Sequence, residues 1–452
     1  MFFSRLFMKL QASQMNLDKN SQVPLYKQLG EIIIKKINAG EYLPNTRMPA
    51  IRTIATEYNI NNSTVVGAYK YLEKKQMVYS IMGSGTYVAM QKEMPKVILK
   101  DIPMSQQRYI NFADTSLDPA FFPKNDLKKS FEAVIERDGA KAFSFTDTSG
   151  YTPLCETISQ MEKKENVQII SDISQGIEII LDTFISPGDA VIVESPTSLA
   201  IVAALLQKGA KVLEVPVTED GLDLDKLFYF TKKYKPKLFF LMPNFQTPTN
   251  ICYTEKTKIY ILQLANKFNA YIIEIDNYND FFYSKKPQTL LAMDNDDRVL
   301  YIKSFERIIS AGLLGYIIYP KGVKFFAGGA SGYIQRGLDF YFKNFDYDNH
   351  CKNIRTAYAQ RYKKAVAVTE TFLSPFCTVF AKSEGGLCLW LKLKKELADC
   401  FPVDKVLVSL GQLYFRYEQM QYFRISYANV SLDDISKGIG ILASVLTGKQ
   451  KG

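Results

Sequence analysis

Residues 24–88 read PLYKQLGEIIIKKINAGEYLPNTRMPAIRTIATEYNINNSTVVGAYKYLEKKQMVYSIMGSGTYV, and the spacing of their apolar side chains decides the fold of this part of the chain. Apolar residues recur at helical spacing over residues 24–39, which predicts an amphipathic helix. A second helical pattern covers residues 50–58, a tight turn is predicted at 59–62, and a third helix over 64–75. Two short helices joined by a tight turn make a helix-turn-helix.

Two short strands are predicted after the third helix. Residues 79–81 and 86–88 flank Met-Gly-Ser-Gly, whose glycines permit a positive φ at the tip of a hairpin. Helix, helix-turn-helix and hairpin together make a winged helix. The third helix, with Asn62 or Ser63 as its expected cap, begins in short polar side chains that can reach base edges or phosphates.

This stretch strongly resembles the DNA-binding domain of the GntR family, in P-L-Y-x-Q-L, R-M-P-A-x-R, N-N-S-T-V, A-Y-K-Y-L and G-S-G-T-Y-V. The resemblance implies that Arg52 contacts DNA and that the wing near Gly83 approaches the minor groove. A surface ion pair is the alternative interpretation of Arg47 and of Arg52, and Asn62 stands where many relatives have arginine. The residues predicted to contact double-stranded operator DNA are Arg47, Arg52, Asn61, Asn62, Ser63, Thr64, Gly83 and Ser84.

Charge is unevenly distributed along the 452 residues. The net charge is +10; residues 1–90 hold 11 basic and 5 acidic side chains (+6), which leaves +4 for residues 91–452. A basic module joined to a nearly neutral larger part is typical of a nucleic-acid-binding protein. The six cysteines form no C-x-x-C pair and a single histidine is present, which argues against disulfides, a metal site and a Ser-His-Asp triad.

Four segments are expected: an N-terminal extension (1–22), the winged helix (23–90), a linker (91–108) and a large domain (109–452). No apolar run reaches the roughly 18–20 residues that span a membrane, and residues 1–15 do not resemble a signal peptide. The expected location is therefore the cytoplasm, without a membrane partner. The large domain shows short β-rich runs between helical stretches, which predicts a mainly parallel α/β sheet. The runs are 190–193, 212–215, 238–242, 270–275, 299–302 and 315–319.

Seven motifs of the large domain, in order, resemble the fold-type I aminotransferases. They are S-G-Y-T-P-L (149–154), P-G-D-A-V-I-V-E-S-P-T (187–197), P-N-F-Q-T-P-T-N (243–250), E-I-D-N-Y (274–278), Y-I-K-S-F-E-R-I-I-S-A-G-L-L-G-Y (301–316), E-G-G-L-C-L-W (384–390) and F-R-I-S-Y-A (423–428). A GntR-type winged helix ahead of such a domain is the layout of the MocR subgroup. The resemblance implies a multidomain fold, a winged helix (α+β) plus an α/β fold-type I domain, and a homodimer.

Relatives with this fold hold pyridoxal 5'-phosphate through a lysine, because an amine condenses reversibly with the aldehyde. Here Arg307 occupies the matching position, and a guanidinium stays protonated. Lys303 lies four residues earlier, is expected in the strand facing elsewhere, and is a poor substitute. No catalytic residue is predicted, no cofactor is assigned, and covalent attachment of the family cofactor is not expected.

Other parts of the cofactor site also differ from the family pattern. Asp172 stands where the phosphate would lie, and with Gln175 it fits a capping box that closes the helix end. Ser198 replaces an aromatic residue, and the arginine of the G-L-R-x-G motif is missing around Gly312.

Three matching residues persist in the expected effector pocket. Asp276 and Tyr278 match the family's carboxylate beneath the pyridine nitrogen and its neighbouring phenol, and Arg424 matches the arginine that pairs a substrate carboxylate. Asp276 has a helix cap, and Arg424 a structural ion pair, as alternative interpretations. The sequence therefore predicts a DNA-binding regulator whose large domain senses an unidentified small molecule or only dimerises. The alternative is an active aminotransferase that carries a DNA-binding module.

Overall fold

The computed structural model describes most of the chain. The described residues are 17–18, 21, 23–38, 42, 47–75, 77–81, 85–89, 109–309, 314–325, 330–380, 383–394, 405–415 and 421–447. The chain divides into two compact units, Met1–Ile102 and Pro103–Gly452. Most of the expected extension, the expected linker 91–108, and Gly83, Ser84 and Gly312 lie outside the described residues.

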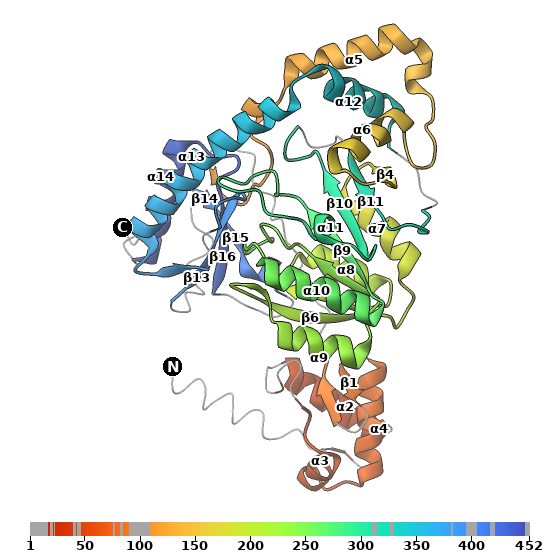
Figure 1. The fold of residues 1–452 in the computed structure, drawn as a ribbon. Coiled ribbons are helices and arrows are strands. Elements are labelled where there is room, and N and C mark those ends of the chain that lie inside the picture. The colour runs from red at the N-terminus through yellow and green to blue at the C-terminus, as the bar shows by residue number, and fades with distance from the viewer. Residues whose placement is uncertain are drawn as a thin grey trace. The chain divides into compact units, whose positions relative to one another are not determined.

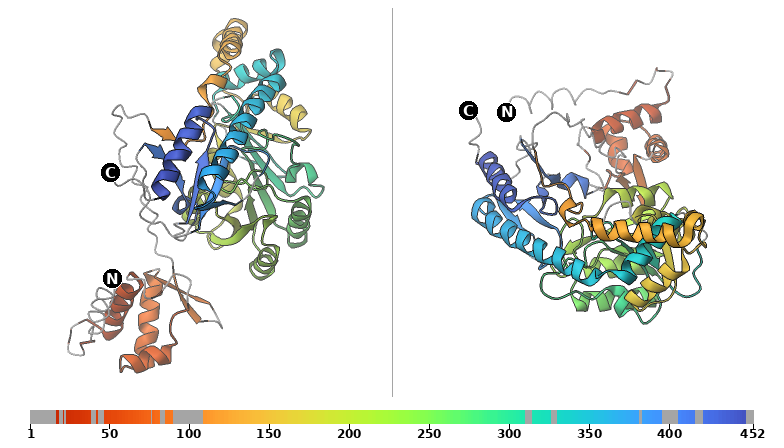
Figure 2. Two further views of the ribbon diagram at one scale, coloured as in Figure 1. Left: turned by 90° about the vertical axis from the view of Figure 1, so that its left-hand side faces the viewer. Right: turned by 90° about the horizontal axis from the view of Figure 1, so that it is seen from above.

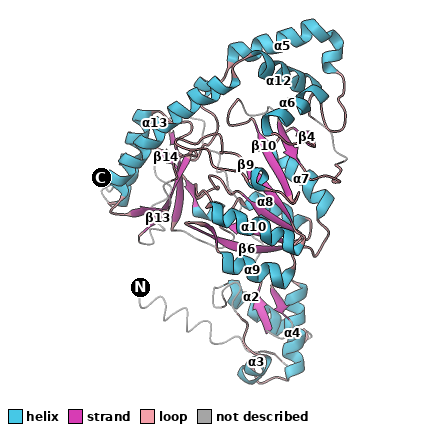
Figure 3. Cartoon of the chain, in the orientation of Figure 1, coloured by secondary structure: helices cyan, strands magenta, loops and turns pink. Residues whose placement is uncertain are grey.

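The described residues of the first unit form a winged helix of three helices and a hairpin (Figure 3), which confirms the predicted fold. Its elements are α2 (Leu25–Asn38), α3 (Ile51–Glu57), α4 (Asn62–Lys74), β1 (Val78–Ile81) and β2 (Gly85–Val88). The apolar positions that repeat at helical spacing meet in one core, which leaves the polar helix faces to solvent. The core includes Leu29, Ile33, Ile54, Val65, Ala68, Leu72, Val78 and Val88.

The start of α4 corrects one detail of the prediction. The expected first residue was Thr64, capped by Asn62 or Ser63, but α4 begins at Asn62 and its N-cap is Asn61. The carbonyl of Asn61 accepts hydrogen bonds from the amides of Thr64 (3.0 Å) and Val65 (3.4 Å), so the first helical turn closes two residues earlier. The Asn61 side chain makes no cap hydrogen bond.

The second unit is built on an eight-stranded sheet ordered β4-β11-β10-β9-β8-β5-β6-β7 (Figure 1). In that order the strands are Val167–Ile170, Gly315–Ile318, Val299–Ser304, Tyr271–Asp276, Leu238–Leu241, Ala190–Ser195, Lys211–Thr218 and Gly221–Leu222. Strands β10, β9, β8, β5 and β6 run parallel, so the prediction of a mainly parallel sheet is confirmed. All six predicted strands are present.

Strand β11 is antiparallel to both of its neighbours, and β7 is antiparallel to β6. Only the short segment 305–314 joins β10 to β11. A parallel neighbour needs a crossover of about a dozen residues or more, so the short connection accounts for the reversed direction.

Helices cover both faces of this sheet, because alternate strand residues point to opposite sides. Val191 and Val193 pack in one core with α7 (Ile173–Phe184) and α8 (Leu199–Gln207), whereas Ile192 belongs to the core of the other face. The helices that contribute to that second core or pack beside it include α5 (Lys124–Asp138), α6 (Thr152–Glu162), α9 (Leu224–Tyr234), α10 (Glu255–Phe268), α11 (Leu290–Met293) and α12 (Gly332–Asn344).

A smaller antiparallel sheet, ordered β12-β13-β16-β15, completes the second unit. Its strands are Cys377–Val379, Cys388–Leu393, Tyr422–Ser426 and Ser409–Leu410. The long helix α13 (Tyr347–Leu373) and α14 (Leu432–Leu446) lie side by side (Figure 2). Two further short strands, β3 (Ile110–Asn111) and β14 (Val406–Leu407), pair in parallel. Short 3-10 helices, η1–η3, cover Pro119–Phe121, Gly139–Phe143 and Gly411–Leu413.

Candidate functional site

The start of α4 presents polar side chains to solvent. Asn61, Asn62 and Ser63 are exposed and Thr64 is half-buried, while Arg52 is exposed on α3. The ion pairs between described residues of this unit are Lys36–Glu57 and Lys75–Glu31, so the guanidinium of Arg52 is not held in one. A helix N-terminus with exposed polar side chains can accept a phosphate group.

The base of the wing is built around Arg47. Its backbone bridges Tyr87 of β2, and the amide of Met48 donates to the carbonyl of Thr86 at 2.8 Å. Gly85 has φ +123°, and a Cβ at that position would lie 2.8 Å from Nε of Arg47. Gly85 therefore allows the exposed Arg47 side chain to cross the hairpin closely.

Asp276 lies at the carboxyl end of β9 and is only 4% exposed. One carboxylate oxygen accepts the amide of Asn279 at 3.0 Å, and the other accepts the hydroxyl of Tyr301 at 2.5 Å. Burial raises the pKa of Asp276, and Lys303 opposes that rise. A bond from a carboxylate to the amide three residues ahead is the interaction of a helix cap, which was the alternative interpretation of Asp276. No helix follows Asp276, however.

Lys303 is a buried cation beside Asp276. It lies in β10, as expected, in register with Asp276 of β9, and its ammonium is 2.8 Å from Asp280 and 3.5 Å from Glu162. Burial acts to lower the pKa of Lys303, but Asp280 and other neighbours hold it well above its usual value. Burial acts to raise the pKa of Asp280, but Lys303 and Lys286 hold it well below its usual range.

Sequence reasoning missed Asp280, Glu162 and Tyr301 as members of this cluster. Tyr301 and Lys303 are two residues apart in one strand, so both point to the same face, a relation that the strand period could have revealed. Asp280 follows the E-I-D-N-Y motif by two residues. The contact with Glu162 comes from the end of α6, so it depends on the tertiary fold.

Arg307 lies in the turn after β10, and its side chain is 19% exposed. Nη1 donates to the carbonyl of Thr115 at 2.6 Å, and Nη2 is 3.5 Å from Glu306. Nε is buried without a hydrogen-bond partner among the described residues. A buried guanidinium N–H without an acceptor is costly, so this group is suited to a ligand oxygen.

Arg424 of β16 is 7% exposed. Nη2 donates to the carbonyl of Ala113 and to Oγ of Ser409, both at 3.2 Å, and the guanidinium lies 5.2 Å from the ring centre of Tyr414. Its Nε also lacks a partner, and no ion pair between described residues includes Arg424. The structural ion pair considered for this residue is therefore not formed within the described part of the chain.

Arg307 and Arg424 both donate hydrogen bonds to one short segment of the chain. They donate to the carbonyls of Thr115 and Ala113, which are two residues apart. Two residues of extended chain span roughly 7 Å, so the two guanidinium groups lie in the same region. Tyr278, also buried, packs against Phe281 with ring centres 6.5 Å apart.

Asp172 and Ser198 lie at the starts of two helices. Asp172 is the N-cap of α7, where its carboxylate accepts the amide of Gln175 at 2.9 Å, and the Gln175 side chain accepts the amide of Ser171 at 2.7 Å. Ser198 is the N-cap of α8 but makes no side-chain cap hydrogen bond. None of the hydrogen bonds or ion pairs between described residues joins either side chain to Arg307 or Arg424.

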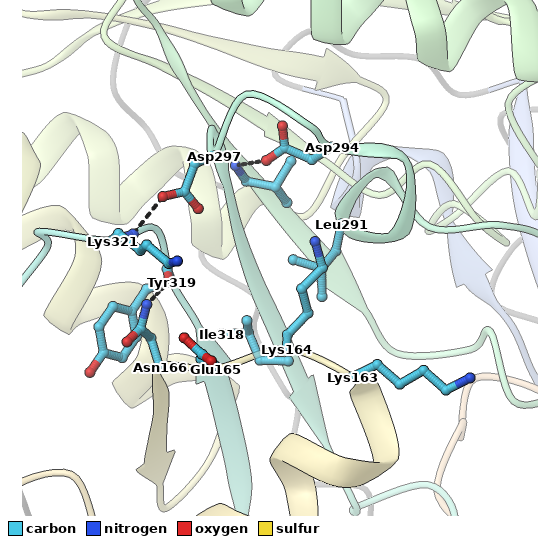
Figure 4. Close-up of a pocket in the computed structure, with 11 residues that line it drawn as sticks. Lys163, Lys164, Glu165, Asn166, Leu291, Asp294, Asp297, Ile318, Tyr319 and Lys321 are labelled. Atoms are coloured by element: carbon cyan, nitrogen blue, oxygen red, sulfur yellow. Dashed lines mark hydrogen bonds between the residues drawn. The ribbon is translucent and has the colours of Figure 1, made fainter.

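A separate pocket of about 290 Å³ opens at the other end of the large sheet, beside Val299 at the start of β10 (Figure 4). Its carboxylates have structural tasks: Asp297 accepts the amide of Lys321 at 2.7 Å, and Asp294 accepts the amide of Val299 at 2.9 Å. Ligands of open α/β sheets bind at the carboxyl ends of the strands, where Asp276 and Arg307 lie. The pocket in Figure 4 is therefore not the candidate site.

Two further kinds of feature are absent from the described residues. Within that part of the chain, no helix is long and apolar enough to cross a membrane. It also contains no group of three or more side chains that could hold a metal ion.

Two family descriptions match the chain, one for each unit. Residues 25–88 match "Bacterial regulatory proteins, gntR family", and residues 117–319 match "Aminotransferase class I and II". The chain therefore carries a GntR-type DNA-binding domain at residues 25–88. Its second unit is an aminotransferase-like domain, so the expected pairing of domains is confirmed.

Relatives named as regulators align with nearly the whole chain. The chain is 26% identical over 467 aligned residues to the HTH-type transcriptional regulator YdfD of Bacillus subtilis, and the match covers 93% of this chain and 96% of YdfD. It is 23% identical to the probable rhizopine catabolism regulatory protein MocR of Rhizobium meliloti, covering 95% of each chain. Both matches are consistent with the MocR-type subgroup of GntR regulators.

The fold of the second unit is also found in a solved structure. Alpha-aminoadipate aminotransferase LysN of Thermus thermophilus, complexed with N-(5'-phosphopyridoxyl)-L-leucine, superimposes with a TM-score of 0.70. The identity is 21%, and the match covers 76% of this chain and 93% of LysN. The regulator therefore carries the fold-type I aminotransferase fold.

Proposed function

We propose that this chain is a sequence-specific DNA-binding transcription regulator whose aminotransferase-like unit binds a small anionic effector without transamination. The proposal that the chain binds DNA is supported by the match of residues 25–88 to the GntR description and by the similarity to a named transcriptional regulator. The feature that carries the other half is the side chain of Arg307, whose guanidinium stands, by resemblance to the fold-type I aminotransferases, where that family has its cofactor lysine.

The DNA-binding half rests on the exposed side chains of α3 and the start of α4. Arg52 lies outside every ion pair between described residues of its unit, and Asn62 and Ser63 are exposed at a helix N-terminus. We expect arginine to contact phosphates and the short polar side chains to contact base edges. A homodimer would present two winged helices to paired half-sites of an operator.

The residues of the candidate site do not fit covalently held pyridoxal 5'-phosphate. Arg307 cannot condense with an aldehyde, and Lys303 is an ammonium between two carboxylates, whereas condensation needs a free amine. The start of α7, which would face the phosphate, is already capped by Asp172. We therefore propose no reaction step through this cofactor.

The two arginines support an anionic effector. Arg307 and Arg424 each keep a buried Nε–H without a partner among the described residues, and both contact the segment 113–115. A carboxylate bound by a guanidinium forms short, strong hydrogen bonds, and two arginines favour a ligand with more than one acidic oxygen. Such a ligand would accept hydrogen bonds from the two Nε–H groups, which have no acceptor among the described residues.

The effector is tested by thermal unfolding of the full chain with a panel of monocarboxylates, dicarboxylates and B6 vitamers. A ligand at about 100 times its Kd stabilises the folded state by about 2.7 kcal/mol, which raises Tm. We expect a rise with at least one acidic compound, and its loss in Arg424→Gln. No rise with any compound would favour the remaining candidate, an effector-free dimerisation scaffold.

The alternative, an active aminotransferase with a DNA-binding module, is tested on the purified chain mixed with pyridoxal 5'-phosphate. We expect no internal-aldimine absorbance band that borohydride removes, in the parent chain or in Lys303→Met. A band that Lys303→Met abolishes would refute the absence of cofactor chemistry.

DNA binding is tested by gel-shift titration with a promoter fragment from the gene's own upstream region. Arg52→Ala is expected to weaken binding and to lower the slope of log affinity against log salt by about 1, because one phosphate contact is lost. Arg137→Ala, an exposed arginine of the second unit, is the control and should bind as the parent does. Unchanged binding by Arg52→Ala would refute the assigned role.

A further inference from the structure

The outer face of α9 carries an unusual density of lysine. Lys226, Lys232 and Lys233 lie on the helix, Lys235 and Lys237 follow it, and Asp225 is the only acidic residue between 224 and 237. This segment has a net charge of +4, from five lysines and one aspartate. Because residues 91–452 together also carry +4, the rest of that region is neutral overall.

Most of these lysines have no anionic partner among the described residues. Lys237 pairs with Asp189 at 2.7 Å, but no ion pair in that part of the chain includes Lys226, Lys232, Lys233 or Lys235. Lys232, Lys233 and Lys235 are exposed. We call these three side chains, together with the neighbouring Phe228 and Tyr229, the α9 basic face.

Aromatic rings hold part of this charge in position. Tyr229 is 52% exposed and Phe228 is 37% exposed, so both rings are open to contact from solvent. The Lys233 ammonium lies 5.1 Å from the ring centre of Tyr229 and donates to its hydroxyl at 2.7 Å. The Lys232 ammonium lies 5.9 Å from the ring centre of Phe228. Rings that restrain the ammonium groups reduce the entropy that binding an anion would cost.

We propose that the α9 basic face binds the phosphate backbone of duplex DNA, without reading its sequence. Several unpaired ammonium groups with exposed rings complement a regular array of phosphates better than a single small anion. The chain already carries a DNA-binding winged helix, and DNA held there raises the local concentration of phosphates for a second surface on the same chain. This inference rests on the proposed DNA-binding function.

The test uses the full chain and a fluorescent duplex of random sequence, titrated at several salt concentrations. The variant K232E/K233E/K235E is expected to bind at least about tenfold more weakly. The slope of log affinity against log salt should fall by about 3 units, since each lost phosphate contact removes about 0.9. The control K352E/K363E/K364E changes three exposed lysines of α13 and should match the parent.

The outcomes separate the two proposals. Weaker binding by Arg52→Ala together with unchanged binding by K232E/K233E/K235E would overturn the α9 basic face and leave the winged helix standing. The reverse result would support α9 and remove the role of Arg52. Vesicles containing phosphatidylserine are the second probe: α9-dependent vesicle binding with α9-independent DNA binding would also overturn the proposal. Equal Tm values of the variants establish that each is folded.

Discussion

Lys303 and Arg307 are four residues apart, and their partners give them different roles. Lys303 is held between Asp280 and Glu162, so its charge is neutralised inside the protein. Arg307 donates a hydrogen bond to a backbone carbonyl, and its guanidinium lies near the carboxylate of Glu306. Its Nε–H group has no acceptor among the described residues. A cation with open donors can bind an external anion, whereas a cation between carboxylates stabilises the fold.

The Lys303–Asp280 pair leads to a prediction about stability. Asp280→Asn is expected to lower the free energy of unfolding by about 3 kcal/mol at pH 7, because a buried ammonium then loses its nearest carboxylate. The folded pKa of Asp280 is far below its unfolded value near 4, so its stabilisation is present above about pH 4 and is lost as pH falls further. The difference between parent and variant should therefore be smaller at pH 3.

Urea titrations of both chains at pH 7 and pH 3 measure this difference. The control is Glu132→Gln, which removes the exposed pair with Lys128 and is expected to cost less than about 1 kcal/mol. A cost for Asp280→Asn as small as that of the control would contradict a stabilising buried pair.

At the scale of elements, the N-termini of α4 and α7 are used differently. Asp172 closes the start of α7 by accepting the amide of Gln175, so the helix end is satisfied from within. Asn61, at the start of α4, makes no such side-chain bond. The helix dipole and the amides at the start of α4 therefore remain available to an external phosphate, in line with the proposed contact to DNA.

The cap of α7 gives a second prediction. Asp172→Ala is expected to lower the free energy of unfolding by about 1 kcal/mol, because an amide of the first turn loses its acceptor. Asp172→Ser keeps a capping oxygen but removes the charge, so it should stay within about 0.5 kcal/mol of the parent. Thermal unfolding of the three chains measures both values. Equal losses in the two variants would show that the cap is not what stabilises this helix end.

At the scale of the whole molecule, an apolar patch on the second unit suggests where two copies meet. Phe145 is fully exposed and Phe143 is 65% exposed, while Ile135 on the nearby α5 is 45% exposed. The ring of Phe143 stacks on Tyr333 with centres 4.8 Å apart. Exposed aromatic side chains grouped in this way are typical of a protein interface.

The predicted homodimer is tested by sedimentation velocity. Phe145→Asp is expected to shift the chain from twice its own mass toward the monomer, because a buried interface does not tolerate an unpaired charge. Phe372→Asp, which changes a Phe that is 49% exposed on α13, is the control and should remain a dimer. Dimers of unchanged stability in both variants would exclude the patch as the interface.

Local patterns predicted the elements better than their contacts. The winged helix was predictable because the helical spacing around Leu29 and Leu72 depends only on neighbouring residues. The parallel sheet was predictable for the same reason, since each of its six apolar runs is a local pattern. The strand β7 and the smaller sheet were not predicted. For β7 the reason is its length, because a strand of two residues carries no periodic signal. The start of α4 was misjudged for a similar reason, since Asn61 and Asn62 are equally good caps by type.

The sequence by itself determined the two-domain architecture and the chemical identity of each candidate side chain, Arg307 among them. Only the tertiary structure decided that Lys303 pairs with Asp280 and Glu162, and that Arg307 and Arg424 meet at residues 113–115. The physical reason is that periodicity and side-chain type act over a few residues. A charge finds its partner only when strands, turns and helices distant in the chain pack together.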